Sequence, residues 1–449
     1  MKVYWVCLLV GLTSLLSAQP EFGCIGSTDV QYATGPNNSH KLAFRSEIFE
    51  PAIDTITLVF QSSESIFIAT SGRGGSPWSR PQPLYAGHNP GIATGRNGDR
   101  QLVWEMVDTV SGVQNIFYRN LEYRMMPLNV SQSPVECQHP DVCGDYAGVA
   151  HIVWVEAGRL WYRRADQHGL IGERYCVSES IAGVCDLPAI EEFNDGIAVV
   201  WQSFDSTQTS PYLILRRRQV GGVWQPEEVL MESTQPLRHP SVDFSLGEES
   251  FSAGWERSVG GNFEAYFYGG NGGGYSTAGA STAPVLTTIR DIWSYLFWEE
   301  DSAGVKDIFT HFYYFMSGWY GRNSMRNLCS IDESMFAPNC LGALLVWTQR
   351  ETAPYKVMWA FFDYPIAVEE SPRLKEKRRR ESSPFARRVL FIPEADKLSP
   401  AVSVLFDRTG KKVLNLKAGG NDVSRISLGV YFVRRRGRGS EVEKVVILR

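Results

Sequence analysis

The chain has 449 residues, of which 43% are hydrophobic and 12% aromatic; this is too much apolar surface for a disordered protein and too great a length for one ordinary domain. Its net charge of −5 is unevenly distributed, because residues 371–449 hold 20 Lys and Arg against 8 Asp and Glu, or +12, which leaves −17 for residues 1–370. An acidic main body repels phosphate backbones, so we expect no nucleic acid partner.

The N-terminus has the pattern of a secretory signal peptide. Met1 and Lys2 precede an apolar run from Val3 to Leu16, and small residues follow before a cleavage site that we place after Ala18. The run is shorter than the roughly 20 residues of a membrane-spanning helix. We therefore expect residues 1–18 to be removed during export and the mature chain to have no transmembrane segment.

One apolar segment that ends in an aromatic residue recurs seven times. The aromatic residues, spaced 44, 50, 47, 54, 43 and 49 residues apart, are Phe60, Trp104, Trp154, Trp201, Trp255, Trp298 and Trp347. A proline precedes each of them, at Pro51, Pro90, Pro140, Pro188, Pro240, Pro284 and Pro338. Because proline cannot donate to a sheet ladder, we place it at the first residue of an innermost strand.

A second short alternating run follows each aromatic residue, as in residues 115–119 and 159–163. Two such runs joined by a turn form a hairpin, and a repeat of 43 to 54 residues with about four strands is the size of a propeller blade. A blade cannot bury its apolar face alone, which favours closure into a ring. The sequence predicts an all-β fold: a seven-bladed β-propeller over residues 19–363 and a small C-terminal β-sandwich. Six or eight blades would result from a partial end repeat, or from ring closure by the strand near residues 42–44.

Six of the eight cysteines lie in close sequence pairs. In an oxidising compartment, such pairs predict local disulfides, namely Cys137–Cys143, Cys176–Cys185 and Cys329–Cys340. Cys7 lies in the signal peptide, and Cys24 is left without a partner. No Cys-x-x-Cys occurs, His139 is the one histidine close to a cysteine pair, and the seven histidines have no metal-ligand spacing, so we expect no metal and no other cofactor.

Acidic residues stand just after several of the recurring aromatic residues. Two carboxylates about 5–10 Å apart could hydrolyse a glycosidic bond, and Glu256 and Glu299 are the candidate catalytic residues from the group Glu105, Glu156, Glu256, Glu299 and Glu300. The alternative is that these residues form solvated acidic strand ends. Trp293, Trp319 and Tyr320 lie outside the repeat register and are candidates for a ligand-binding platform, whereas the repeated tryptophans are expected to pack between blades.

Two segments resemble the Asp box of sialidase-like propellers, Ser-x-Asp-x-Gly-x-x-Trp. Residues 71–78 read Ser-Gly-Arg-Gly-Gly-Ser-Pro-Trp, with Arg73 in place of the aspartate, and residues 219–226 keep a turn glycine and Trp224. In that family the box stabilises the turn between a blade's outer strands, so the resemblance implies architecture and not activity. Sialidases have an Arg-Ile-Pro segment near the first blade, and residues 44–47 are only a faint counterpart of it. The three arginines and the Tyr/Glu pair of sialidases have no assignable counterpart in this sequence.

Residues 364–395 form a linker by composition, with prolines and the basic run of residues 373–380. Beyond it, residues 396–449 contain three motifs in order: Asp407-x-x-Gly410-Lys411-x-Val413, then Gly429-Val430-Tyr431-Phe432-Val433, and finally Lys444-Val445-Val446-Ile447. This segment resembles the type A C-terminal sorting domain of the type IX secretion system. The resemblance implies entry into the periplasm, then passage across the outer membrane by the secretion machinery, with release or attachment at the cell surface. A plain β-sandwich module is the alternative.

Together these features predict a secreted or cell-surface propeller that binds a glycan, peptide or protein. The alternatives are a glycoside hydrolase related to sialidases and a structural component of the cell surface.

Overall fold

The computed structural model describes residues 21–35, 40–45 and 55–361 of the propeller region, with gaps at 73–75, 96, 146, 180–182, 194–195, 206–210, 245–250, 269–272, 276–278, 290–292, 303–304, 315–317, 325–334, 342–343 and 350–352. Toward the C-terminus it describes 385–386, 389–392, 403–407, 411–435 without 418, 424 and 428, and 442–447. The chain divides into two compact units, Met1–Val368 and Glu369–Arg449. The described residues contain strands and no helix, and so no helix that could cross a membrane.

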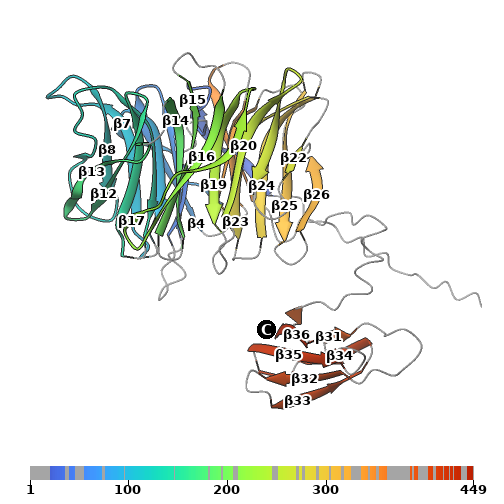
Figure 1. Cartoon of the computed structure of the whole chain (residues 1–449). Helices are drawn as coiled ribbons and strands as arrows, with labels where there is room; N and C mark the ends of the chain where they lie inside the picture. The colour runs from blue at the N-terminus through green and yellow to red at the C-terminus, as the bar shows by residue number, and fades with distance from the viewer. Residues whose placement is uncertain are drawn as a thin grey trace, which may run out of the picture. The chain divides into compact units, whose positions relative to one another are not determined.

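The described residues of the larger unit form seven antiparallel sheets (Figure 1). The first holds β2 (Leu42–Arg45), β3 (Thr55–Ser62), β4 (Ser65–Gly72) and β5 (Gln82–Ala86), and the second holds β6 (His88–Thr94), β7 (Arg100–Val107), β8 (Gln114–Asn120) and β9 (Leu128–Asn129). The third holds β10 (Cys137–Gly144), β11 (Ala150–Glu156), β12 (Arg159–Asp166) and β13 (Gly169–Cys176).

The fourth sheet holds β14 (Val184–Phe193), β15 (Gly196–Phe204) and β16 (Tyr212–Val220), with both β17 (Val223–Trp224) and β18 (Glu228–Ser233) paired to β16. The fifth holds β19 (Leu237–Phe244), β20 (Phe251–Val259), β21 (Asn262–Tyr268) and β22 (Gly273–Tyr275). The sixth holds β23 (Ala280–Ile289), β24 (Trp293–Ser302), β25 (Val305–Tyr314) and β26 (Gly318–Ser324). The seventh holds β27 (Met335–Leu341), β28 (Leu344–Gln349) and β29 (Tyr355–Phe361).

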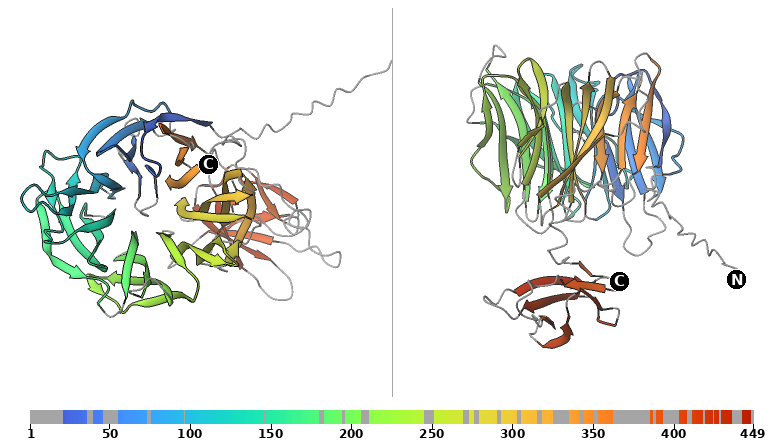
Figure 2. Two further views of the ribbon diagram at one scale, coloured as in Figure 1. Left: turned by 90° about the horizontal axis from the view of Figure 1, so that it is seen from above. Right: turned by 90° about the vertical axis from the view of Figure 1, so that its right-hand side faces the viewer.

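The sheets stand around a ring (Figure 2). The first strands of successive sheets contact one another, and β27 of the seventh sheet contacts β2 of the first, so these strands lie innermost and the ring closes. Such radial repetition of four-stranded sheets defines a β-propeller. The fold class predicted from the repeats is therefore confirmed.

The ring is closed by the N-terminus and not by the strand near residues 42–44. Strand β1 (Glu21–Thr28) pairs with β29 as the outermost strand of the seventh sheet, with Gly23 opposite Trp359. Just beyond this strand, the hydroxyl groups of Thr34 and Thr348 lie 2.8 Å apart. The seventh sheet thus combines residues from both ends of the propeller.

The recurring aromatic residues lie on the second strand of each sheet. Each proline from Pro90 to Pro338 lies on the innermost strand of a sheet, which pairs with this second strand. Our placement of proline at the first strand residue is wrong. Pro90 is the third residue of β6 and Pro140 the fourth of β10, and in both strands the register shifts at the proline. A bulge leaves its extra residue outside the ladder, so the missing N–H of proline costs no hydrogen bond there.

The first repeat differs, because Pro51 lies outside the described residues and β2 begins before it. Leu42 pairs with Leu58 as Ile92 pairs with Leu102 in the second sheet. His40 therefore occupies the position that proline holds in the next sheet.

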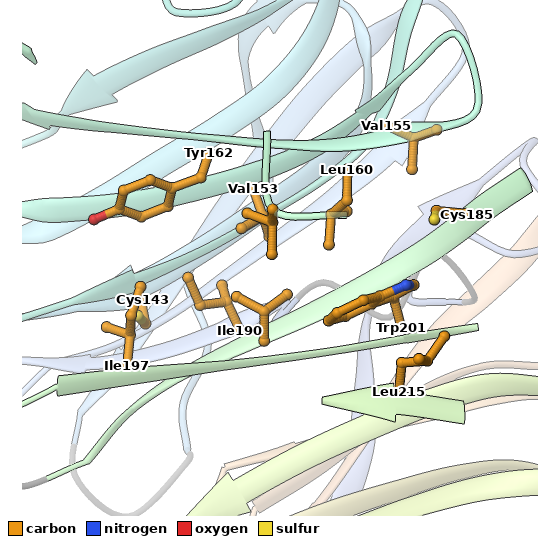
Figure 3. Packing of buried hydrophobic residues seen from close by; sticks show 12 residues of the cluster. Cys143, Val153, Val155, Leu160, Tyr162, Cys185, Ile190, Ile197, Trp201 and Leu215 are labelled. Carbon is orange, nitrogen blue, oxygen red and sulfur yellow. The ribbon is translucent and has the colours of Figure 1, made fainter. Parts of the chain in front are cut away.

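The repeated tryptophans pack between blades, as predicted. Trp104, Trp154, Trp201, Trp255, Trp298 and Trp347 are each at most 1% exposed. Between the third and fourth sheets, Trp201 packs with Val155, Leu160, Leu215 and other apolar side chains (Figure 3). Each such indole removes a large apolar area from water, which holds adjacent sheets together.

The two segments with the Asp-box pattern lie at turns between third and fourth strands. The Ser71 hydroxyl donates to the carbonyl oxygen of Pro77 over 3.0 Å, and Ser71 and Trp78 form a β-bridge. Trp224 stacks on Tyr175 of the third sheet, with ring centroids 5.5 Å apart. Both tryptophans therefore have structural positions at blade edges.

The predicted disulfides Cys137–Cys143 and Cys176–Cys185 are absent, because all four cysteines are free, as is Cys24. Cys137 and Cys143 lie six residues apart on the single strand β10, opposite Glu156 and His151, which separates them by about 20 Å. Cys176 ends the outer strand β13, whereas Cys185 lies on the innermost strand of the next sheet. For Cys137 and Cys143, closeness in sequence therefore did not mean closeness in space. Cys329 and the side chain of Cys340 lie outside the described residues.

The smaller unit has one five-stranded sheet in the order β30, β36, β35, β32, β33 and one sheet of two strands. Its strands are β30 (Phe385–Ala386), β31 (Val389–Ile392), β32 (Ser403–Asp407), β33 (Lys412–Leu416), β34 (Gly419–Asp422), β35 (Gly429–Arg435) and β36 (Val442–Ile447). Its own core contains Leu405, Leu416, Val423, Tyr431 and Val433. The small β-sandwich predicted at the C-terminus is therefore present.

Candidate functional site

The side chain that follows the recurring aromatic residue connects neighbouring sheets in four places. Its oxygen accepts the backbone N–H of the residue before the bulge proline in the next sheet. The pairs are Gln61 with Asn89 (3.2 Å), Glu105 with His139 (2.7 Å), Gln202 with His239 (2.9 Å) and Glu256 with Ala283 (2.6 Å). These N–H groups have no ladder partner at the bulge, so the side chains satisfy donors that would otherwise be unpaired.

Glu256, a predicted catalytic residue, is fully committed to this role. Its carboxylate is 1% exposed and lies 2.5 Å from Arg238 Nε and 2.7 Å from His239 Nδ1. Burial opposes ionisation, but the positive charges of His239 and Arg238 outweigh it and lower the pKa of Glu256 below its ordinary value. A general acid needs a raised pKa, so this carboxylate is suited to an ion pair and not to proton donation.

The other predicted carboxylates are also buried. Glu299 follows Trp298 and pairs with Thr282 beside a bulge. Glu300 accepts hydrogen bonds from Trp298 Nε1 (3.0 Å) and the Ser281 hydroxyl (3.1 Å). In the third sheet, Glu156 accepts from Trp154 Nε1 and pairs with Arg174 over 2.7 Å. The alternative of solvated acidic strand ends is therefore wrong for these residues, because they lie inside the propeller.

The predicted aromatic platform lies far from these carboxylates. Trp293 begins β24, and Trp319 and Tyr320 lie on β26, opposite Tyr313 and Phe312 of the intervening strand β25. The register brings all three positions to one end of the sixth sheet, while Glu299 lies six residues further along β24. Six strand residues span about 20 Å. The side chains of the three aromatic residues lie outside the described set.

A cluster of ionisable side chains connects the innermost strands. His40 lies just before β2, and its Nδ1 is 3.3 Å from Asp141 Oδ1 on β10 while its Nε2 is 3.5 Å from Glu191 Oε2 on β14. The second Asp141 oxygen accepts the N–H of Ile190 over 2.9 Å. Burial alone would lower the pKa of His40, but the negative charge of Asp141 dominates and raises it to about 10.

Lys41 is the buried neighbour of this cluster. Its side chain is 1% exposed, and its ammonium donates to the carbonyl oxygen of Pro90. Burial lowers the pKa of Lys41 to about 7, although Asp141 and Glu105 act in the opposite direction. Burial also raises the pKa of Glu191 to about 8, against the effect of His40. Strongly shifted pKa values concentrate in functional and in structural charge networks alike.

Sequence reasoning missed this cluster. His40, Asp141 and Glu191 lie 101 and 50 residues apart along the chain, and no spacing rule brings them together. The signal that could have found them is the alignment of repeats, because Lys41, Gly91 and Asp141 occupy the same strand position in three successive sheets.

Within the part of the chain that the structure describes, no three His, Cys, Asp or Glu side chains are arranged to hold a metal ion. Arg45, in the segment with a faint sialidase likeness, pairs with Glu122 over 2.6 Å, and Arg100 binds the same carboxylate over 2.6 Å. These arginines neutralise a carboxylate of the propeller itself.

No protein-family model and no curated protein sequence matches the chain. Among solved structures, it is similar to the β-propeller domain of the Trilobed protease from Pyrococcus furiosus, with 10% identity and a TM-score of 0.45 over 74% of this chain and 98% of that one. It is also similar to the six-bladed, fucose-recognising Aleuria aurantia lectin, with 9% identity and a TM-score of 0.37 over 65% of this chain and 96% of that one. A third similar structure is an endo-arabinase from Bacteroides thetaiotaomicron, with 15% identity and a TM-score of 0.33 over 56% of this chain and 99% of that one. These likenesses concern the fold.

Proposed function

We propose that the protein is an exported or cell-surface β-propeller that binds a glycan, peptide or protein ligand without converting it. One observation carries the proposal: the carboxylates best placed for catalysis are buried and already hold the sheets together. Glu256 has Arg238, His239 and the Ala283 N–H as partners. A glycosidase needs two carboxylates that reach the substrate, and a buried tie between sheets does not.

The position of the aromatic platform agrees with binding. Trp293, Trp319 and Tyr320 share one end of the sixth sheet, and the predicted carboxylate of that sheet, Glu299, lies about 20 Å along the strand. Aromatic rings can stack on sugars or peptides without any nearby acid. A hydrolase would need both groups at one place.

Export through the type IX secretion system is the second part of the proposal. The smaller unit has a core of its own, as a separable sorting domain requires. In the Asp407 motif, the Asp407 carboxylate accepts the Lys411 N–H over 3.0 Å, and the Asp407 N–H donates to the Lys411 carbonyl oxygen. In the second motif, Tyr431 is buried and its hydroxyl donates to the Ser427 carbonyl oxygen.

A paired assay of binding and hydrolysis tests the first part. We expect the folded protein to bind members of a glycan or peptide array and to release no product from a panel of chromogenic glycosides. The triple variant Trp293→Ala, Trp319→Ala, Tyr320→Ala should lose binding at least tenfold. Tyr123→Ala, at an exposed aromatic residue between β8 and β9 of the second sheet, should not. Turnover that disappears in a folded Glu299→Gln variant would favour the glycosidase instead.

Transfer of the C-terminal segment tests the second part. A reporter with residues 1–18 at its N-terminus and residues 396–449 at its C-terminus should reach the exterior of a bacterium that has a type IX system, and should stay in the periplasm without the second segment. Tyr431→Ala should block this export, because the substitution leaves a cavity in the core of the smaller unit. Lys412→Ala should not block it, because Lys412 is exposed. Equal export with and without residues 396–449 would refute the assignment.

A further inference from the structure

His40 connects four of the seven sheets. It precedes β2 of the first sheet, and its carbonyl oxygen accepts the N–H of Ile92 in the second sheet over 2.8 Å. Its own N–H donates to Asp141 Oδ1 in the third sheet over 3.2 Å. Its ring lies between Asp141 and Glu191 of the third and fourth sheets.

The geometry of the ring specifies its charge. Both ring nitrogens face carboxylate oxygens, at 3.3 Å for Nδ1 and 3.5 Å for Nε2. A neutral imidazole has one N–H and one acceptor nitrogen, and an acceptor nitrogen next to a carboxylate is repelled. When Asp141 and Glu191 are both ionised, only the imidazolium form donates from both positions. The proton is therefore part of the contact between the sheets.

We propose that His40 is a proton-dependent lock, in which the imidazolium holds the start of β2 to the innermost strands of the third and fourth sheets and loosens this contact when it loses its proton. The lock concerns how the propeller is held together, and it is independent of the proposed binding function. Asp141 is the fixed part of the lock, since its carboxylate is fully buried and accepts donors from both His40 and Ile190.

Among the described residues, the charged groups that act on the ring come from several innermost strands. Asp141 comes from β10 and Glu191 from β14, and the negative charge of Asp243 on β19 also acts on His40. Lys41, the next residue in sequence, is the positive neighbour, and Glu105 of β7 acts on Lys41. Glu192 and Asp145 also carry charge in this region, because they act on the Cys143 thiol together with Asp141 and Glu191. Negative charge exceeds positive charge here, which favours the protonated ring.

The direction of the pH effect follows from these charges. The pKa of His40 is raised from 6.5 to about 10, so its stabilising contribution is complete below pH 6.5 and is lost as the pH rises through about 10. The lowered pKa of Lys41 makes the stability of the fold rise with pH above pH 7, which opposes the effect of His40. The raised pKa of Glu191 makes the stability fall as the pH rises to about 8. The wild-type profile alone therefore does not isolate His40, and a comparison of variants is needed.

Thermal unfolding of the full chain between pH 6.5 and 10.5 makes that comparison. We expect the melting temperature of His40→Gln to lie below that of the wild type at pH 6.5, and the difference to shrink as the pH rises. Glu191 loses a positive neighbour in the variant, which raises the pKa of Glu191 further. This narrows the pH range over which the difference in melting temperature shrinks, but it does not make the difference grow. His168→Gln, at an exposed turn, is the matched control and should show no such trend. A difference that stays constant or grows with pH would overturn the lock.

Histidine-labelled NMR provides a test that does not require a stable His40 variant. One ring resonance should keep its imidazolium signature above pH 8, and Glu191→Gln should shift the titration of that resonance to lower pH. The pKa of His139 is also raised, but its ring partner is Asp186, so its resonance should not respond to Glu191→Gln. If every histidine titrates near pH 6.5, or if no resonance responds to Glu191→Gln, the proposal is wrong.

Discussion

Lys41 is a buried charge on the inner side of the first sheet. Lys41 in the first sheet and Gly91 in the second occupy equivalent positions, and the Lys41 ammonium reaches the Pro90 carbonyl oxygen, next to Gly91 in sequence. The negative charges of Asp141 and Glu105 favour the charged form of Lys41. Burial still dominates, so the charged form of Lys41 is unfavourable in the folded protein.

Replacement of Lys41 by methionine should change the pH dependence of stability. The pKa of Lys41 is lowered from 10.5 to about 7, so the folded state opposes protonation and the full cost is present below pH 7. We expect Lys41→Met to raise the melting temperature at pH 6 and to raise it less at pH 10. The exposed Lys412→Met is the control. A Lys41→Met variant that is destabilised equally at both pH values would show that the Pro90 contact outweighs the buried charge.

At this scale, the sequence predicted residue environments better than residue partners. The repeated tryptophans are buried as their periodicity indicated, since periodicity reports which face of a strand is covered. The partners of Glu256 and the state of the cysteines were not predictable, because both depend on which strand lies opposite. Cys137 and Cys143 are close in sequence, but an extended strand holds them apart.

The bulge on the innermost strands is the recurrent local element of this propeller. The residue before the proline has a positive φ in five successive sheets, at Asn89, His139, Leu187, His239 and Ala283. Residues with side chains avoid this conformation, and those before proline are further restricted. The side-chain oxygens that accept their N–H groups offset the strain in four of the five sheets, and in the fourth sheet the Leu187 N–H is bound by Asp186.

Ala283 offers a direct measure of this strain. Its φ is 51°, and its N–H bond to Glu256 does not depend on the side chain. Glycine adopts positive φ without cost, so Ala283→Gly should stabilise the protein by about 1 kcal/mol in chemical denaturation. Ala265→Gly, at a buried position of β21 with ordinary backbone, should destabilise it. If both substitutions destabilise equally, the bulge is not strained.

The strands themselves were largely predictable, because alternation of apolar residues marks a half-buried strand. The pairing of these strands within a sheet was not predictable. The sequence placed the prolines at strand beginnings, whereas they lie at bulges in the third to fifth positions of β6, β10, β14, β19 and β23. Bulges arise from the pairing of two strands, and a single strand's sequence carries little trace of them.

The closure of the ring belongs to the scale of the whole molecule, and it depends on close contact between β1 and β29. A Cβ atom on Gly23 would lie 2.9 Å from Trp359 Nε1, which is closer than real contacts allow. Trp359 is 5% exposed and packs in the core of the seventh sheet. The indole therefore has little freedom to move away.

Gly23→Val should weaken this closure. Overpacking of this kind costs about 1–3 kcal/mol, and a loosened β1 exposes the edge of β29. We expect a lower melting temperature and oligomers on size-exclusion chromatography. Gly72→Val is the matched control, because no atom lies within 4 Å of its added Cβ. Equal behaviour of the two variants would mean that β1 is not needed for a stable ring.

The sequence predicted a closed ring but not which segment closes it. Closure follows from the general need of each blade to cover its neighbour, whereas the choice of β1 depends on hydrogen bonding between distant segments. The boundary strand near residues 42–44 was a plausible alternative, and the structure uses it to begin the first sheet.

The contact between Thr34 and Thr348 spans 314 residues of sequence, and this separation orders events during biogenesis. Strand β1 is synthesised before the other described strands of the propeller, but its partner β29 follows only after the first six sheets. Throughout that interval its backbone donors and acceptors are available to any other strand, including those of other nascent chains. A cell that makes this protein therefore has to keep β1 soluble until β29 has been synthesised.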